Sequence, residues 1–178
     1  PRMFMVHWDV SLSSINTYKI LMKRGISVHF AIDNDGTIHQ WMDAEDIAYH
    51  AGNRIVNNRS IGVEIANAYY LKYQKYYENK GFGSRPVWMN KRVHGRTLDP
   101  FLGFYPVQME ALKALIEAIH RAYPTISLDF PKDRTGQMTS GVYPDAKKGK
   151  FSGIVNHYHI TERKIDCAGA PIDDIVRQ

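Results

Sequence analysis

The sequence predicts a single-domain α/β protein in which helices pack on a mixed central β-sheet. A length of 178 residues is that of one domain, so we expect the domain to span residues 1–178. Apolar residues make up 44% of the chain and charged residues 23%, as in ordinary globular proteins. The predicted elements follow the order strand, helix, hairpin, strand, helix, strand, which is typical of a mixed sheet covered by helices.

The first strand is predicted at residues 3–8, where aromatic and β-branched side chains alternate with others. Ser13 or Ser14 is suited to cap a helix that runs to Arg24, and Gly25 ends it. Apolar side chains recur along this helix at helical spacing and predict its buried face. They are Ile15, Tyr18, Leu21 and Met22.

A hairpin and a fourth strand are predicted next. The buried face of the second strand is formed by Val28, Phe30 and Ile32. The turn Asn34-Asp35-Gly36 then leads into a third strand at 37–42. Residues 43–58 are predicted to be a loop, and residues 60–66 a strand whose apolar side chains face away from Glu64.

The second half of the chain is less regular. Residues 68–106 are rich in Tyr, Lys, Asn and Gly and show little periodicity. A long irregular stretch in a compact domain is usually functional, so we interpret it as an elaborated insertion near a binding surface. A helix is predicted from Pro106 to Ala122, then a loop at 124–152, a short strand at 153–156 and a helical turn at 172–176.

The charge of the chain favours an anionic partner. The net charge is +5, from 23 Lys and Arg against 18 Asp and Glu, which suits nucleic acid, a membrane surface or an acidic cell-wall polymer. We find no nucleic-acid-binding motif and no apolar run of about 18 residues, so neither nucleic acid nor stable membrane insertion is expected. A strand predicted at the start of the chain also argues against a signal peptide. Cys167 is the only cysteine, which fits a reducing compartment.

Two histidines and a carboxylate are candidate metal ligands. His7 lies within the first strand, His157 closes the short strand, and Asp166 follows. Catalytic zinc takes three such ligands and keeps one position open, as metal-assisted hydrolysis requires. Taken singly, each residue is as well explained by a structural role. Lys164, two residues before Asp166, is placed to stabilise an oxyanion, and Glu64 lies on a strand among small side chains.

Five motifs, in this order and spacing, resemble the zinc-dependent N-acetylmuramoyl-L-alanine amidases of type 2. They are VHWDVS, SVHFAIDNDGTIHQ, AYHAGN, SIGVEI and NHYHITERKIDC. The family includes lysozyme-like phage endolysins and cytosolic recycling amidases, and is similar to peptidoglycan-recognition domains. The resemblance covers about residues 3–175 and implies the amidase type 2, peptidoglycan-recognition-like fold.

The resemblance implies a zinc ion held by His7, His157 and Asp166, with Glu64 as general base and Lys164 as oxyanion stabiliser. Cys167 is the alternative third ligand, because thiolates also bind zinc well. Lysozyme-like members carry a tyrosine just before the histidine of the second strand. In this chain Val28 takes that place, which leaves the proton transfer to Glu64.

The resemblance also implies the substrate. We expect hydrolysis of the amide between N-acetylmuramic acid and L-alanine in peptidoglycan or muropeptides, with His50, Asn67 and His159 contacting the substrate. A phage endolysin is favoured, located in the host cytoplasm before its release to the cell wall. The alternatives are a muropeptide-recycling amidase of the bacterial cytoplasm and a non-catalytic peptidoglycan-binding module. We expect a monomer.

Overall fold

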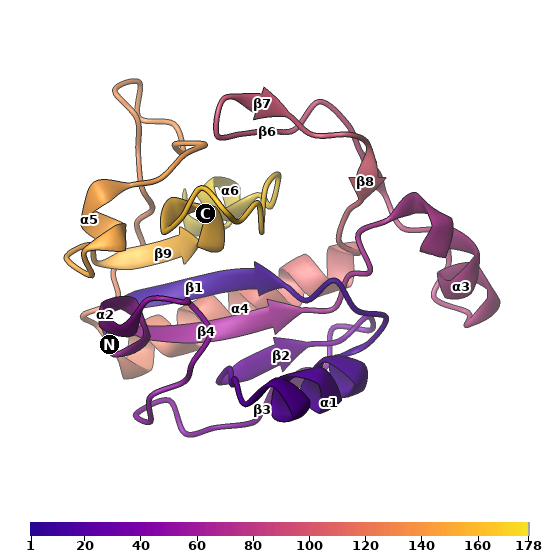
Figure 1. The fold of residues 1–178 in the computed structure, drawn as a ribbon, viewed down its shortest axis with the longest axis horizontal. Helices are drawn as coiled ribbons and strands as arrows, with labels where there is room; N and C mark the ends of the chain where they lie inside the picture. Colours follow the sequence, from indigo (N-terminus) through magenta and orange to yellow (C-terminus); the bar gives the residue numbers. More distant parts are fainter. Residues whose placement is uncertain (178) are drawn as a thin grey trace.

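The computed structural model describes residues 1–177, and residue 178 lies outside the described part. A five-stranded mixed sheet of order β3-β2-β4-β1-β9 forms the centre (Figure 1). Its strands are β1 (Met3–Trp8), β2 (Phe30–Ile32), β3 (Ile38–Gln40), β4 (Ser60–Ile65) and β9 (Gly153–Asn156). Strands β2, β4, β1 and β9 are parallel, and β3 is antiparallel to β2. The predicted α/β class and mixed sheet are therefore confirmed.

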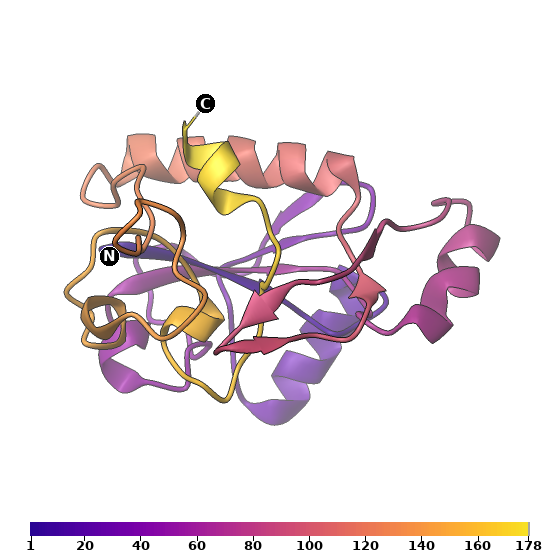
Figure 2. The same ribbon diagram turned by 90° about the horizontal axis from the view of Figure 1, so that it is seen from above.

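Helices cover both faces of the sheet. Figure 2 shows α4 (Pro106–Ala122) along one face and α1 (Ser14–Arg24) on the other. Phe4, Val6 and Trp8 pack in one apolar cluster with α4 and with α6 (Ile172–Arg177). Met5 faces a second, smaller cluster on the opposite side, so the two faces of β1 divide as the alternation predicts. No helix within residues 1–177 is both long and apolar enough to cross a membrane.

The bounds of α1 agree with the prediction, but its predicted buried face is wrong. Ser13 caps the helix by accepting a hydrogen bond from the Asn16 N–H, and Gly25 ends it with a φ of 64°. The residues that α1 buries are Ser14 and Thr17, whereas Met22 is 64% exposed. The helix turns this polar side inward because Thr17 Oγ1 donates a hydrogen bond to the carboxylate of Asp9.

Two short helices lie in segments predicted to be loops. They are α2 (Arg54–Asn57) and α5 (Pro144–Lys147). Each has four residues, which is too short to show a helical period in the sequence. The cap of α2 is a local signal, since the Asn53 side chain accepts from the N–H groups of Ile55 and Val56.

The predicted insertion at 68–106 contains small regular elements rather than one loop. They are η1 (Leu71–Tyr73), α3 (Gln74–Asn79), β5 (Val87–Trp88), β6 (Arg92–Val93), β7 (Arg96–Thr97) and β8 (Phe101–Leu102). Strands β5 and β8 pair with each other, as do β6 and β7. In both views α3 stands out at one end of the molecule (Figures 1 and 2). The β6–β7 turn reaches back to the body, where His94 Nε2 lies 2.9 Å from the Lys164 carbonyl oxygen.

A buried arginine attaches the insertion to the sheet. The guanidinium of Arg85 lies between the rings of Tyr77 and Tyr105, 4.2 and 4.4 Å from their centroids. It donates hydrogen bonds to acceptors from four separate parts of the fold. They are Asn34 Oδ1, Ala66 O, Gly103 O and Gln108 Oε1. Arg85 is 2% exposed, so these bonds form out of contact with water.

We predict that Arg85→Met lowers the free energy of unfolding by about 2 kcal/mol or more, because buried acceptors lose a charged donor. Urea denaturation followed by circular dichroism measures the effect. The exposed Arg134 provides the matched control, and Arg134→Met should change stability by no more than about 0.5 kcal/mol. Equal stability of the two variants would show that Arg85 does not anchor the insertion.

Candidate metal centre

The parallel strands bring the candidate ligands to one edge of the sheet. In the pairing of β1 with β4, His7 is opposite Glu64. In the pairing of β1 with β9, Val6 is opposite Asn156, so His157 follows directly beside His7. The carboxyl ends of parallel strands form such an edge, where α/β proteins commonly bind their ligands.

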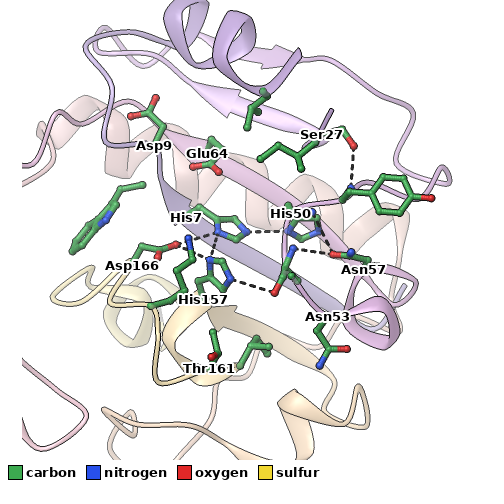
Figure 3. A pocket seen from close by; sticks show the side chains of 18 of the residues that line it. His7, Asp9, Ser27, His50, Asn53, Asn57, Glu64, His157, Thr161 and Asp166 are labelled. Carbon is green, nitrogen blue, oxygen red and sulfur yellow. Dashed lines mark hydrogen bonds and ion pairs between the residues drawn. The ribbon is translucent and has the colours of Figure 1, made fainter. Parts of the chain in front are cut away.

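Three candidate ligand atoms form a nearly equilateral triangle. His7 Nδ1 lies 3.0 Å from His157 Nδ1, and each of these nitrogens lies 3.1 Å from Asp166 Oδ2 (Figure 3). All three residues are buried. Two ligand atoms of a tetrahedral zinc site, each about 2.0–2.1 Å from the ion, are about 3.3 Å apart. The triangle therefore has the size and the donor atoms that one zinc ion needs.

The protonation states of His7 and Asp166 also suit a cation. Burial and the neighbouring His157 together lower the pKa of His7 to about 4, against the raising effect of Asp166, so the imidazole is neutral at pH 7. Burial raises the pKa of Asp166, but its contacts with His157 and His7 outweigh burial and hold that pKa below the usual range. A neutral imidazole and an ionised carboxylate are the forms that bind metals.

Cys167, the alternative ligand, does not join this group. Its side chain is fully buried in the apolar cluster that includes Phe4 and Val6. Burial raises the pKa of the Cys167 thiol well above its usual value, and the thiolate is the form that binds zinc. The geometry therefore favours Asp166 over Cys167 as the third ligand.

Glu64 lies beside the triangle with one carboxylate oxygen unused. Its side chain is half-buried, and Oε2 has no hydrogen-bond partner among the described residues. Burial raises the pKa of Glu64 well above 4.5, and the carboxylates of Asp9 and Asp166 raise it further. A raised pKa is what a carboxyl group needs in order to take up and release a proton near neutral pH.

The triangle and Glu64 open into a cavity of about 800 Å³, a usual size for a ligand site. Lys164 lines this cavity together with other basic side chains. They are Arg24, Lys147 and Arg163. Apolar side chains, among them Val10, Ile20 and Tyr49, also line it and are exposed. The cavity therefore offers a polar centre with basic and apolar walls.

Of the predicted substrate-contacting residues, only His50 lines the cavity. Asn67 is fully buried, where its amide donates to Leu102 O and accepts from the Tyr69 N–H. His159 is also fully buried, and its Nε2 lies 2.9 Å from Thr139 O. Direct substrate contact is thus not supported for Asn67 or His159. Asn67 follows β4 and His159 follows His157 closely in the sequence, but closeness in sequence does not show which way a side chain points, and both side chains point inward.

Sequence reasoning missed Asp9, which lines the cavity. The carboxylate accepts hydrogen bonds from the backbone N–H groups of Ser11 and Asn67 and from the Thr17 hydroxyl. Burial nevertheless raises the pKa of Asp9 to about 7. The sequence did carry a signal for Asp9, because Asp9 comes two residues after His7 and alternation places both side chains on the same face.

A mixed α/β sheet with a buried His–His–Asp group at its parallel strand ends offers the kind of ligands that metal-assisted hydrolysis requires. The profile of the N-acetylmuramoyl-L-alanine amidase family matches residues 1–169, and the chain belongs to this family. A search of curated proteins gives no match.

Solved structures share the fold at low sequence identity. AmpDh3 from Pseudomonas aeruginosa is 20% identical with a TM-score of 0.63, and the match covers 99% of this chain and 58% of AmpDh3. An N-acetylmuramoyl-L-alanine amidase from Clostridium intestinale is 18% identical with a TM-score of 0.56, and the match covers 98% of this chain and 82% of that amidase. The chain thus spans little more than half the length of AmpDh3.

We predict one zinc ion per chain, lost in Asp166→Ala and retained in Cys167→Ala. Removing the carboxylate takes away one of three ligands, whereas the thiol lies in the apolar core. Metal analysis after dialysis against zinc measures the stoichiometry, and Cys167→Ala is the matched control. Zinc that persists in Asp166→Ala and disappears in Cys167→Ala would assign the third ligand to sulfur.

Proposed function

We propose that this protein is a zinc-dependent amidase that hydrolyses the amide between N-acetylmuramic acid and L-alanine of the stem peptide. The observation that carries the proposal is the unpaired carboxylate of Glu64 beside the His7–His157–Asp166 triangle in one cavity. The family match supports it. The fold supports it as well, because it is similar to the structure of AmpDh3 in complex with anhydromuramic pentapeptide. That structure is 20% identical with a TM-score of 0.60, and the match covers 98% of this chain and 59% of AmpDh3.

His7, His157 and Asp166 would hold the zinc ion, which supplies Lewis-acid chemistry and favours water as a nucleophile at neutral pH. Glu64 accepts the proton of the attacking water and later delivers it to the leaving amine. Both steps need a carboxyl group that changes its protonation state readily. The raised pKa of Glu64 meets this need.

Lys164 is proposed to stabilise the negative charge that develops on the carbonyl oxygen. Its side chain is exposed and lines the cavity, and its positive charge lowers the pKa of Glu64, against the effect of burial. The backbone at this position is held by His94, whose Nε2 lies 2.9 Å from the Lys164 carbonyl oxygen. A cation held beside a carbonyl group that is being attacked stabilises the transition state more than the ground state.

The cavity walls suit a peptide that carries carboxylates. Arg24, Lys147 and Arg163 offer positive charge near the site, and Tyr49 offers an exposed aromatic surface. Peptidoglycan stem peptides and soluble muropeptides both present such groups. A peptidoglycan-binding module without catalysis would not need the carboxyl group of Glu64. Burying its Oε2 atom without a hydrogen-bond partner costs free energy.

We propose a phage endolysin as the biological setting, with a cytosolic muropeptide-recycling amidase as the alternative. The insertion at 68–106 supports the first, because it adds aromatic side chains suited to a large polymer, of which Tyr70 and Phe82 are exposed. Release of free amino groups from purified sacculi, compared with soluble muropeptides, distinguishes the two. A recycling enzyme should act only on the soluble substrate. Absence of zinc-dependent release from both substrates would contradict the proposed function.

We predict that Glu64→Gln retains zinc and folding but lowers kcat by roughly 10²–10⁴-fold, the usual contribution of general acid–base catalysis. Release of amino groups from a soluble muropeptide measures kcat. The exposed Glu162 gives the control, and Glu162→Gln should leave kcat unchanged. Near-normal turnover in Glu64→Gln would exclude Glu64 as the proton carrier.

We predict that Lys164→Met lowers kcat by about 10²–10³-fold with little change in KM, because the interaction forms only as charge develops. The long apolar side chain of Met preserves most of the packing. Lys150→Met, which removes another exposed lysine, is the control. A strong rise in KM with kcat intact would instead make Lys164 an anchor for a substrate carboxylate.

A further inference from the structure

We infer that His50 is a positioning residue that fixes the proton of His7, so that His7 Nδ1 is left free to bind the metal. The inference rests on the proposed zinc site. His7 Nε2 lies 2.9 Å from His50 Nδ1, and His50 Nε2 lies 3.1 Å from Ser60 Oγ (Figure 3 labels the two histidines). Ser60 Oγ in turn lies 2.8 Å from the carbonyl oxygen of Val56. These four groups form a continuous chain of hydrogen bonds.

The carbonyl group of Val56 determines which atom donates and which accepts in each of these hydrogen bonds. The carbonyl of Val56 can only accept, so the Ser60 hydroxyl donates its proton there. Ser60 Oγ must then accept from the N–H at His50 Nε2. A neutral imidazole has one N–H, so His50 Nδ1 is an acceptor and receives the proton of His7 Nε2. His7 Nδ1 is left with a lone pair directed at His157 and Asp166.

The His50 ring is held in this position from several sides. At Gly62 on β4, a Cβ atom would lie 2.6 Å from His50 Nδ1, so any side chain there would displace the ring. His29 Nδ1 accepts from the Gly62 N–H, and its ring meets the His50 ring edge to face at 5.9 Å. The backbone N–H groups of His50 and Ala51 both donate to Asn57 Oδ1.

The same segment also contacts the second histidine ligand. His157 Nε2 lies 3.3 Å from the carbonyl oxygen of Ala51, which can only accept. The proton of His157 is thereby directed to Nε2, and its Nδ1 faces the triangle. Residues 50 and 51 thus provide the outer hydrogen-bond partners of both histidines. Such partners orient metal ligands and set their tautomers.

This arrangement also bears on the predicted substrate contact of His50. Both of its ring nitrogens are occupied, one by His7 and one by Ser60. A hydrogen bond from either nitrogen to substrate would break the chain. Zinc affinity, rather than substrate affinity, is therefore the quantity that His50 controls.

Zinc affinity of His50 variants tests the inference. In His50→Ala the acceptor for His7 is lost, and zinc affinity should fall by about 10–100-fold. In His50→Asn the side-chain oxygen replaces Nδ1, and most of the affinity should return. Competition with a chromophoric chelator, using zinc alone, measures the affinity, and circular dichroism checks folding. An unchanged affinity in His50→Ala would overturn the inference.

Gly62→Ala tests the same ring without altering His50. The new methyl group should displace the ring and weaken zinc binding as His50→Ala does. In the double variant that combines Gly62→Ala with His50→Ala, the new methyl group meets no ring, so zinc affinity should be no lower than in His50→Ala alone. Gly141→Ala, where a Cβ meets nothing within 4 Å, is the control. Additive losses in the double variant would contradict the inference.

Nitrogen NMR of histidine-labelled, zinc-free protein gives a readout that needs neither metal nor activity. The wild type should carry the protons of His7 and His50 on Nε2, and His50→Ala should give a mixture of tautomers at His7. A proton on Nδ1 of His50 in the wild type would refute the inferred direction of these hydrogen bonds. A wild type that shows these tautomers but binds no zinc and cleaves no amide would instead contradict the proposed function.

Discussion

The parallel pairing of β4, β1 and β9 is the constraint on which the rest of the site depends. It places His7 opposite Glu64 and leaves His157 one residue beyond the paired end of β9. Because side chains alternate between the faces of a strand, a register slip of one residue would turn His7 toward α4. The ligand triangle, Glu64 and the cavity therefore exist only in this register.

Two carboxylates in one buried site behave in opposite ways because of their neighbours. Contacts with His7 and His157 hold the pKa of Asp166 below its usual range, whereas the unpaired Glu64 has a pKa well above 4.5. The first stays ionised and suits a metal ligand. The second takes up a proton more readily than a free carboxyl group does. Environments that separate two carboxyl groups in this way are typical of acid–base sites.

The insertion is part of the same architecture. Arg85 ties it to the end of β4 and to α4, through Ala66 and Gln108. At its other end His94 contacts the backbone of Lys164. The insertion is thereby anchored to the core on one side and supports the loop that carries Lys164 and Asp166 on the other.

The sequence by itself determined the α/β class, the bounds of β1, α4 and β9, those of α1 and β4 to within one residue, and, through its motifs, the residues of the ligand triangle. Alternation, capping residues and motif spacing are local signals, which a chain displays without its fold. Only the tertiary structure decided that α1 buries Thr17 rather than Ile15, that Asn67 and His159 point inward, and that Asp166 rather than Cys167 faces the histidines. The direction of these side chains depends on partners far along the chain, such as Asp9 for Thr17 and Thr139 for His159, and no local pattern records those contacts.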